Sequence, residues 1–136
     1  MIRKIRFGVL GCSKIAEKSM IPALKNSRNS QLHMIGSRTD RKAKIFSKKF
    51  ACELHGDYDS ILENKEIDAV YISLPPKLHE KWILKAAKHG KHIICEKPTS
   101  VSIKSAKKII KESKKNHIQI AENFAFSLRS FLKTEA

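Results

Sequence analysis

The 136-residue sequence predicts a single α/β domain in which helices cover both faces of a doubly wound parallel sheet, giving three layers. Short apolar runs typical of buried strands alternate along the chain with stretches of helical spacing. Parallel strands joined in this way require right-handed crossovers. A chain of this length buries about two thirds of the surface of its unfolded form, so its core needs no disulfide.

The first apolar run, residues 5–10, predicts a strand that ends in a tight turn at residues 11–13. A helix is expected to begin near Lys14. Because Pro22 lacks a backbone N–H, we expect this helix to break near Met20 and to restart with the proline in its first turn.

Two more strands are predicted in the middle of the chain. Residues 31–38 form the first of them, and Thr39 with Asp40 then offers a cap for a helix. Residues 58–64 predict a short helix, and residues 68–74 are a near-continuous apolar run typical of a strand buried on both faces. The capped helix is expected to carry Ala43, Phe46 and Phe50 on one face.

The last third of the chain predicts two helices, each followed by a strand. The first helix begins at Leu78 and stops before Gly90, and the second covers residues 101–115. Residues 92–95 and 117–123 are the strands. The expected buried faces of the two helices are His79, Trp82, Ile83, Ala86 and Ala87, and Ile103, Ala106, Ile109 and Ile110.

The spacing Gly11-x-Ser13-x-x-Ala16 follows a strand and opens a helix, the context in which G-x-G-x-x-G/A binds a dinucleotide pyrophosphate. Gly11 permits the tight turn, a small residue at 13 admits the phosphate, and Ala16 lets the helix pack on the strand. The hydroxymethyl group of Ser13, where glycine is usual, could crowd the phosphate or hydrogen-bond to it. An ordinary strand-to-helix turn shows the same spacing, so the motif alone leaves both interpretations open.

The end of the second predicted strand carries Ser37 and Arg38, followed by Arg41 and Lys42. An acid at this place binds the adenosine ribose of NAD, whereas arginine accommodates the 2′-phosphate of NADP. No acid stands between the end of this strand and Asp40, so the sequence favours NADP over NAD, although a basic protein carries arginines at many positions.

The formal charge of +15 favours a phosphate-bearing partner, either a nucleotide or a nucleic acid. Six lysines recur at helical spacing in the last predicted helix, but no aromatic stacking platform accompanies them. A solvated helix face is the simpler interpretation, and nucleic acid is not an expected partner. These lysines are Lys104, Lys107, Lys108, Lys111, Lys114 and Lys115.

A few residues indicate in which cellular compartment the protein lies and whether it binds a metal. Cys12, Cys52 and Cys95 are odd in number and widely spaced, which indicates reduced thiols and a cytoplasmic protein. No apolar run approaches the roughly 18 residues of a membrane span, so no membrane association is expected. His89, His92 and Cys95 have a metal-like spacing, but Gly90 separates the histidines and no metal site is expected.

Glu96-Lys97-Pro98 follows the strand 92–95 at the edge where the glycine turn also lies. With GVLGCSKIA, SRTDRKA, DAVYISLPPKLH, AAKHGKH and ICEKPTS in this order, the chain resembles the N-terminal half of the Gfo/Idh/MocA dehydrogenases, from Ile5 to Phe126. The resemblance implies the NADP- or NAD-binding Rossmann domain of an oxidoreductase. Such an enzyme transfers hydride between nicotinamide and a sugar, a cyclitol or a related polyol.

The resemblance also implies roles for individual residues. Lys97 would be the catalytic residue that binds the reacting oxygen and assists proton transfer, with Glu96 beside the nicotinamide. Ser37 and Arg38 would face the adenosine ribose. The remaining cofactor-binding positions would be Gly8, Gly11, Cys12, Ser13, Lys14, Ile15, Ala16, Leu74, Pro75, Pro76 and His79.

Members of this family continue into a second, substrate-binding domain that supplies a D-x-x-x-H segment with an acid/base histidine. We therefore expect residues 1–123 to be the dinucleotide-binding domain and residues 124–136 to be a tail that begins the missing domain. The chain alone would bind cofactor without turning over a sugar, and a homo-oligomer remains open. The alternatives are a basic, non-enzymatic nucleic-acid-binding module and a non-functional truncated remnant.

Overall fold

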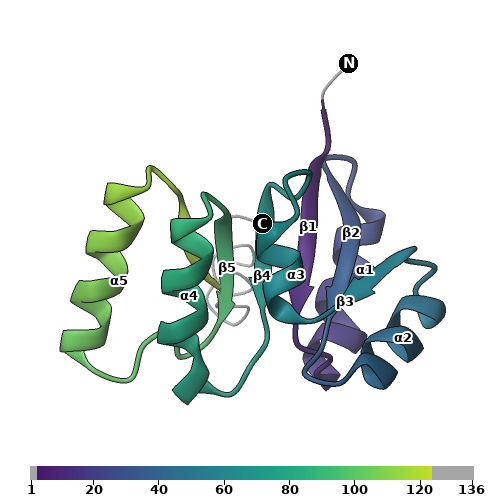
Figure 1. The fold of residues 1–136 in the computed structure, drawn as a ribbon, viewed down its shortest axis with the longest axis horizontal. Helices are drawn as coiled ribbons and strands as arrows, with labels where there is room; N and C mark the ends of the chain where they lie inside the picture. Colours follow the sequence, from purple (N-terminus) through teal and green to yellow (C-terminus); the bar gives the residue numbers. More distant parts are fainter. Residues whose placement is uncertain (1–2, 124–136) are drawn as a thin grey trace, which may run out of the picture.

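The computed structural model describes residues 3–123, which form a six-stranded, all-parallel sheet of order β3-β2-β1-β4-β5-β6 (Figure 1). The chain moves outward from β1 in one direction and then, from β4, in the other, so the switch point lies between β1 and β4. The strands are β1 (Ile5–Leu10), β2 (Ser30–Gly36), β3 (Leu54–Gly56), β4 (Ala69–Ile72), β5 (His92–Glu96) and β6 (Ile120–Asn123).

The helices form a layer on each face of the sheet, which confirms the predicted three-layer α/β architecture (Figure 1). One core joins Val9 of the sheet to Ile21 and Phe46, and the other joins Ile72 to Ile83 and Ile109. The helices are η1 (Ala16–Met20), α1 (Ile21–Asn26), α2 (Asp40–Lys49), α3 (Tyr58–Glu63), η2 (Pro76–Leu78), α4 (His79–Lys88) and α5 (Ile103–Lys115).

The helical stretch after β1 runs through Pro22 without the predicted break. Met20 and Ile21 keep right-handed helical dihedral angles, and the N–H of Ile21 donates to the carbonyl of Ala16, five residues back. This wide π-type turn places Pro22 in the first turn of α1, where a missing N–H leaves no hydrogen bond unmade. The restart at the proline is therefore confirmed, and the break near Met20 is wrong.

Strand β3 was not predicted, because it has only three residues and lies at the edge of the sheet. Leu54 is 42% exposed, so the segment has no apolar run from which a buried strand could be inferred. Its pairing with β2 brings the start of α3 to the carboxyl edge of the sheet.

The predicted buried face of α5 is wrong in part. Ile109 is buried as expected and Ala106 is half-buried, but Ile103 is 76% exposed and Ile110 is 52% exposed. The buried stripe instead runs through Ser105, Ile109 and Ser113, at i, i+4 and i+8. Small serines let α5 pack closely against α4, and the Ser113 hydroxyl donates to the Ile109 carbonyl, so this buried hydroxyl is paired.

Across β1, β4, β5 and β6, the described part of the chain leaves a hollow of about 550 Å³ at the sheet, bordered among others by Phe7, Ile94 and Ala121. The predicted tail, residues 124–136, lies outside the described residues. Within residues 3–123, no helix has the length and apolar character that crossing a membrane would require.

Candidate functional site

A hollow of about 360 Å³ lies at the carboxyl ends of β1, β2 and β4, next to the switch point of the sheet. It gathers seven of the predicted cofactor-binding residues, namely Gly11, Cys12, Ser13, Ser37, Arg38, Leu74 and Pro75. Five further residues complete its lining: Thr39, Lys42, Tyr58, Ser73 and Leu78. We call these twelve residues the cleft.

Gly11 forms the floor of the cleft where β1 turns into η1. Its φ of +109° lies in the region that only glycine adopts readily, and a Cβ there would lie 2.5 Å from the carbonyl oxygen of Ser73. The Gly11 N–H donates to the Gly36 carbonyl at 3.0 Å, which holds the turn against the end of β2. The predicted need for glycine at this turn is therefore both conformational and steric.

The hydroxyl of Ser13 is engaged within the protein. Its oxygen accepts a hydrogen bond of 3.1 Å from the N–H of Ala16 and is also hydrogen-bonded to the hydroxyl of Ser73. Ser13 therefore caps the first helical turn and ties it to the end of β4.

The charge in the cleft is positive. Arg38 and Lys42 both line it, and none of its twelve residues is an acid. The Asp40 carboxylate points instead toward His55, with 3.3 Å between Oδ1 and Nδ1. An anionic group at the end of β2 would therefore meet two cations without a competing carboxylate.

Burial makes Cys12 a poor nucleophile. Desolvation raises the pKa of its thiol from 9.0 to about 11, outweighing the lowering effects of Lys42 and Ser37. The thiol stays protonated near neutral pH, and its Sγ lies 3.8 Å from the Gly36 carbonyl oxygen. Cys12 therefore acts as a small packing residue under the turn, not as a reactive thiol.

Tyr58 is a cleft residue that the sequence did not reveal, because it follows the unpredicted strand β3. Its ring meets Trp82 edge to face, with 5.1 Å between the ring centroids. Burial raises the pKa of the Tyr58 hydroxyl, so the ring presents a neutral hydroxyl at the end of the cleft where Arg38 lies.

Glu96 ends β5 and is held by both neighbouring strands. Its Oε1 accepts hydrogen bonds of 2.5 Å from the Tyr71 hydroxyl and of 2.5 Å from the Asn123 side-chain amide. Burial, followed by the bond to Glu96, raises the pKa of Tyr71, so this hydroxyl remains a donor. Glu96 therefore fixes the strand end from which the exposed Lys97 projects.

The register of the sheet sets the place of Lys97 relative to the glycine turn. Leu10 pairs with Ile72, and Ile72 pairs with Cys95, so the ends of β1 and β5 are two strand intervals apart. Two intervals correspond to about 10 Å. Lys97 thus follows β5 at the same carboxyl edge as the cleft, outside its lining.

Besides Glu96 and Lys97, six of the predicted cofactor positions lie away from the cleft lining. Gly8 is in mid-strand, where a Cβ would lie 2.4 Å from Ile61 Cγ2, and Ala16 is buried in the core. Lys14 and Ile15 are exposed on the first helical turn, and His79 is fully buried. Pro76 lines a separate hollow.

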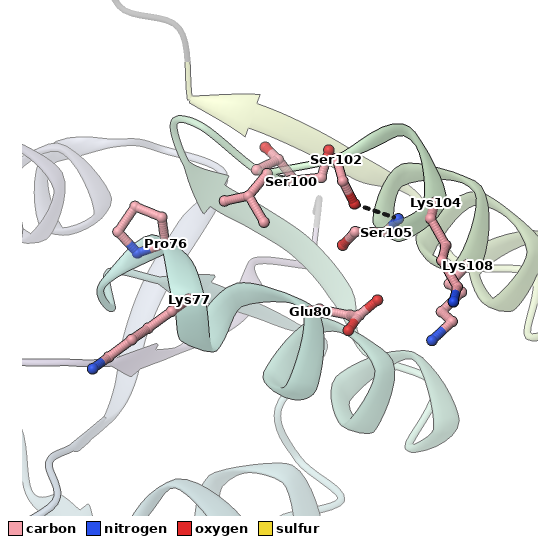
Figure 2. Close-up of a pocket in the computed structure, with 10 residues that line it drawn as sticks. Pro76, Lys77, Glu80, Ser100, Ser102, Lys104, Ser105 and Lys108 are labelled. Carbon is pink, nitrogen blue, oxygen red and sulfur yellow. Dashed lines mark hydrogen bonds between the residues drawn. The ribbon is translucent and has the colours of Figure 1, made fainter.

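That second hollow, of about 240 Å³, lies between the start of α4 and the loop that leads into α5 (Figure 2). Ser102 caps α5 by accepting from the Ser105 N–H at 3.0 Å, as the dashed line shows. Glu80 lies in the same hollow as Lys104 and Lys108, so its charge is mixed. The cleft, by contrast, carries positive charge alone.

No group of three or more His, Cys, Asp or Glu side chains suited to a metal ion occurs within residues 3–123. Cys95 is buried, and burial raises the pKa of its thiol to about 12, so it stays protonated. The lysines of α5, including Lys104 and Lys111, are exposed.

Comparison with known proteins agrees with this geometry. A model of an oxidoreductase family with an NAD-binding Rossmann fold matches residues 5–124. The chain is 34% identical over 126 residues to dTDP-3,4-didehydro-2,6-dideoxy-alpha-D-glucose 3-reductase of Saccharopolyspora spinosa, a match that covers 93% of this chain and 38% of that protein. It is 38% identical over 97 residues to D-xylose 1-dehydrogenase (NADP(+)) 2 of Haloferax volcanii, covering 71% of this chain and 30% of that protein.

Among solved structures, KijD10, a 3-ketoreductase from Actinomadura kijaniata in complex with NADP and TDP-benzene, is similar to this chain. The TM-score is 0.88 at 35% sequence identity, and the match covers 91% of this chain and 38% of that chain. The chain therefore spans well under half the length of the curated relatives and the solved structure that it matches.

Proposed function

Because the chain belongs to the Gfo/Idh/MocA oxidoreductase family, we propose that its cleft binds NADP as the nucleotide-binding domain of a sugar or polyol oxidoreductase. The observation that carries the proposal is the pairing of a glycine-only turn at Gly11 with Arg38 and Lys42 in one cleft without an acid. Relatives and neighbours of similar sequence whose names include NADP support the choice of cofactor.

The cofactor would lie across the carboxyl edge of the sheet. Its adenosine 2′-phosphate would meet Ser37, Arg38 and Lys42 at the end of β2, and its pyrophosphate would approach the backbone at Gly11. Tyr58 would bound the adenosine end of the cleft. From β2 to β5 there are three strand intervals, about 14 Å, over which the dinucleotide would extend toward Lys97.

Lys97 would act where hydride leaves or joins the substrate carbon. Its ammonium group would stabilise negative charge that develops on the reacting oxygen and would donate a proton to that oxygen during reduction. In the direction of oxidation, the neutral amine would accept the proton from the substrate hydroxyl. The nicotinamide of bound NADP supplies the hydride chemistry. Glu96, fixed by Tyr71 and Asn123, would keep the lysine at one place along the edge of the sheet.

Substrate turnover would need a second domain, as the length of the relatives suggests. In an assembly that supplies such a domain, Lys97→Ala should remove turnover while NADPH affinity remains. An unchanged rate would remove Lys97 from the mechanism.

Residues 1–123 would be the cofactor domain, and residues 124–136 would lead into the next domain. The reduced cysteines suggest a cytoplasmic location.

Calorimetric titration of the chain with NADPH and with NADH tests the cofactor proposal. We expect one site per chain for NADPH and an affinity at least tenfold weaker for NADH, because a 2′-hydroxyl cannot pair with Arg38. Absence of heat with millimolar NADPH would contradict cofactor binding, and tighter NADH binding would contradict the assignment of the 2′-phosphate to Arg38.

A further inference from the structure

His79 joins two segments of the site although it is shielded from solvent and is not itself one of the twelve cleft residues. It is the first residue of α4 and is fully buried, with a relative exposure of 0%. Its Nε2 lies 2.7 Å from the carbonyl oxygen of Leu74, and its Nδ1 lies 2.8 Å from the carbonyl oxygen of Pro98. The ring thus bridges the segment after β4 and the segment after β5.

Both partners of this ring are carbonyl oxygens, which can only accept hydrogen bonds. A ring with one proton donates to one carbonyl and leaves a lone pair facing the other, which is repulsive at these distances. Only a ring with a proton on each nitrogen makes both hydrogen bonds. A charged ring without such partners would be costly to bury, and the two carbonyl dipoles offset that cost.

The two carbonyls belong to the two segments that form the proposed site. Leu74 lines the cleft, whereas Pro98 directly follows Lys97. A second hydrogen bond secures the same loop, since the Thr99 N–H donates to Glu122 Oε2 at 2.8 Å. The His79 ring is therefore a direct link between the cofactor cleft and the lysine segment.

We propose that His79 is a positioning residue that donates both ring N–H groups and thereby fixes Lys97 relative to the cofactor cleft. The effect of His79 on ligand binding rests on the proposed NADP function. The sequence predicts a contact between His79 and the cofactor. We infer instead that His79 acts through the backbone carbonyls of Leu74 and Pro98.

The first test compares two ligands. The ligand 2′,5′-ADP occupies only the adenosine end of the cleft, whereas the nicotinamide half of NADPH would also lie against the backbone segments that His79 holds at Leu74 and Pro98, which Lys97→Ala leaves in place. His79→Leu should lower the affinity for NADPH at least fivefold more than the affinity for 2′,5′-ADP. Ile83→Ala removes a fully buried side chain one turn along the same helix without touching either carbonyl, so it should leave the ratio of affinities unchanged. An equal loss for both ligands in His79→Leu would overturn the positioning role.

The second test needs neither a variant nor a ligand. Ring ¹⁵N spectra of the unliganded chain, at the pH of the binding assay, count the protons on His79. Two protonated nitrogens are expected, and one protonated nitrogen would overturn the inference. If the wild-type chain binds neither ligand but the ring carries two protons, the NADP proposal fails and the link between Leu74 and Pro98 stands.

Discussion

Gly11→Ala should lower the melting temperature of the chain by about 10 °C and abolish NADPH binding. A φ of +109° costs a residue with a side chain about 1–3 kcal/mol, and the new Cβ, 2.5 Å from the Ser73 carbonyl oxygen, adds a similar cost. A sum of about 3 kcal/mol corresponds to about 10 °C for a domain of this size. Any shift that relieves the contact moves the turn that would approach the pyrophosphate.

Gly90→Ala is the matched control for this substitution. Gly90 also has a positive φ, +71°, but a Cβ there would have nothing within 4 Å. Its replacement should cost about 1–2 kcal/mol from backbone strain alone, and NADPH should still bind. Differential scanning calorimetry and titration measure both quantities. Equal melting shifts in the two variants would contradict the steric role of the Ser73 carbonyl.

Arg38→Ala should weaken NADPH binding by about ten- to a hundredfold and change NADH binding by less than threefold. Loss of a charge-assisted hydrogen bond to a phosphate costs about 1.5–3 kcal/mol, which corresponds to this range. Lys42 also lines the cleft and would retain part of the attraction, so complete loss is not expected. Parallel titrations with the two cofactors separate an effect on the 2′-phosphate from a general loss of the cleft.

Arg41→Ala removes the same charge from an exposed position in the first turn of α2, outside the cleft lining. It should change NADPH affinity by less than threefold, because exposed charges at a distance are screened by salt. If Arg41→Ala and Arg38→Ala weakened NADPH equally, the binding would reflect overall positive charge and not a phosphate site at Arg38.

The sequence predicts the central strands and the helix α4 well because burial leaves a strong hydrophobic pattern. A strand buried on both faces is a continuous apolar run, and a helix buried on one face shows apolar residues at helical spacing. The run at 68–74 contains β4, and all five expected residues of α4, from His79 to Ala87, are buried. The pattern weakens at the edges of the sheet. Strand β3 is too short to show such a pattern. Helix α5 has two faces that could pack against the sheet, and tertiary packing buries the one that contains Ser105, Ile109 and Ser113.

In the candidate site, too, only some features could be predicted from the sequence, namely those that belong to local motifs. Gly11 and Arg38 belong to local motifs, so their presence in one cleft could be predicted from the sequence. Contacts between distant segments could not, because no spacing rule links Tyr71 to Glu96 or His79 to Pro98. His79 matched a segment expected to line the cofactor, yet its ring is enclosed by backbone carbonyls.

The central claim is that the cleft at Gly11 and Arg38 binds NADP. Amide NMR of the ¹⁵N-labelled chain during titration with NADPH tests it most directly, because each residue reports separately. We expect the largest shifts at residues 11–13, 37–39 and 73–74, with saturation at one ligand per chain. Shifts confined to the lysines of α5, or no shifts at residues 11–13 and 37–39 with millimolar NADPH, would contradict the claim.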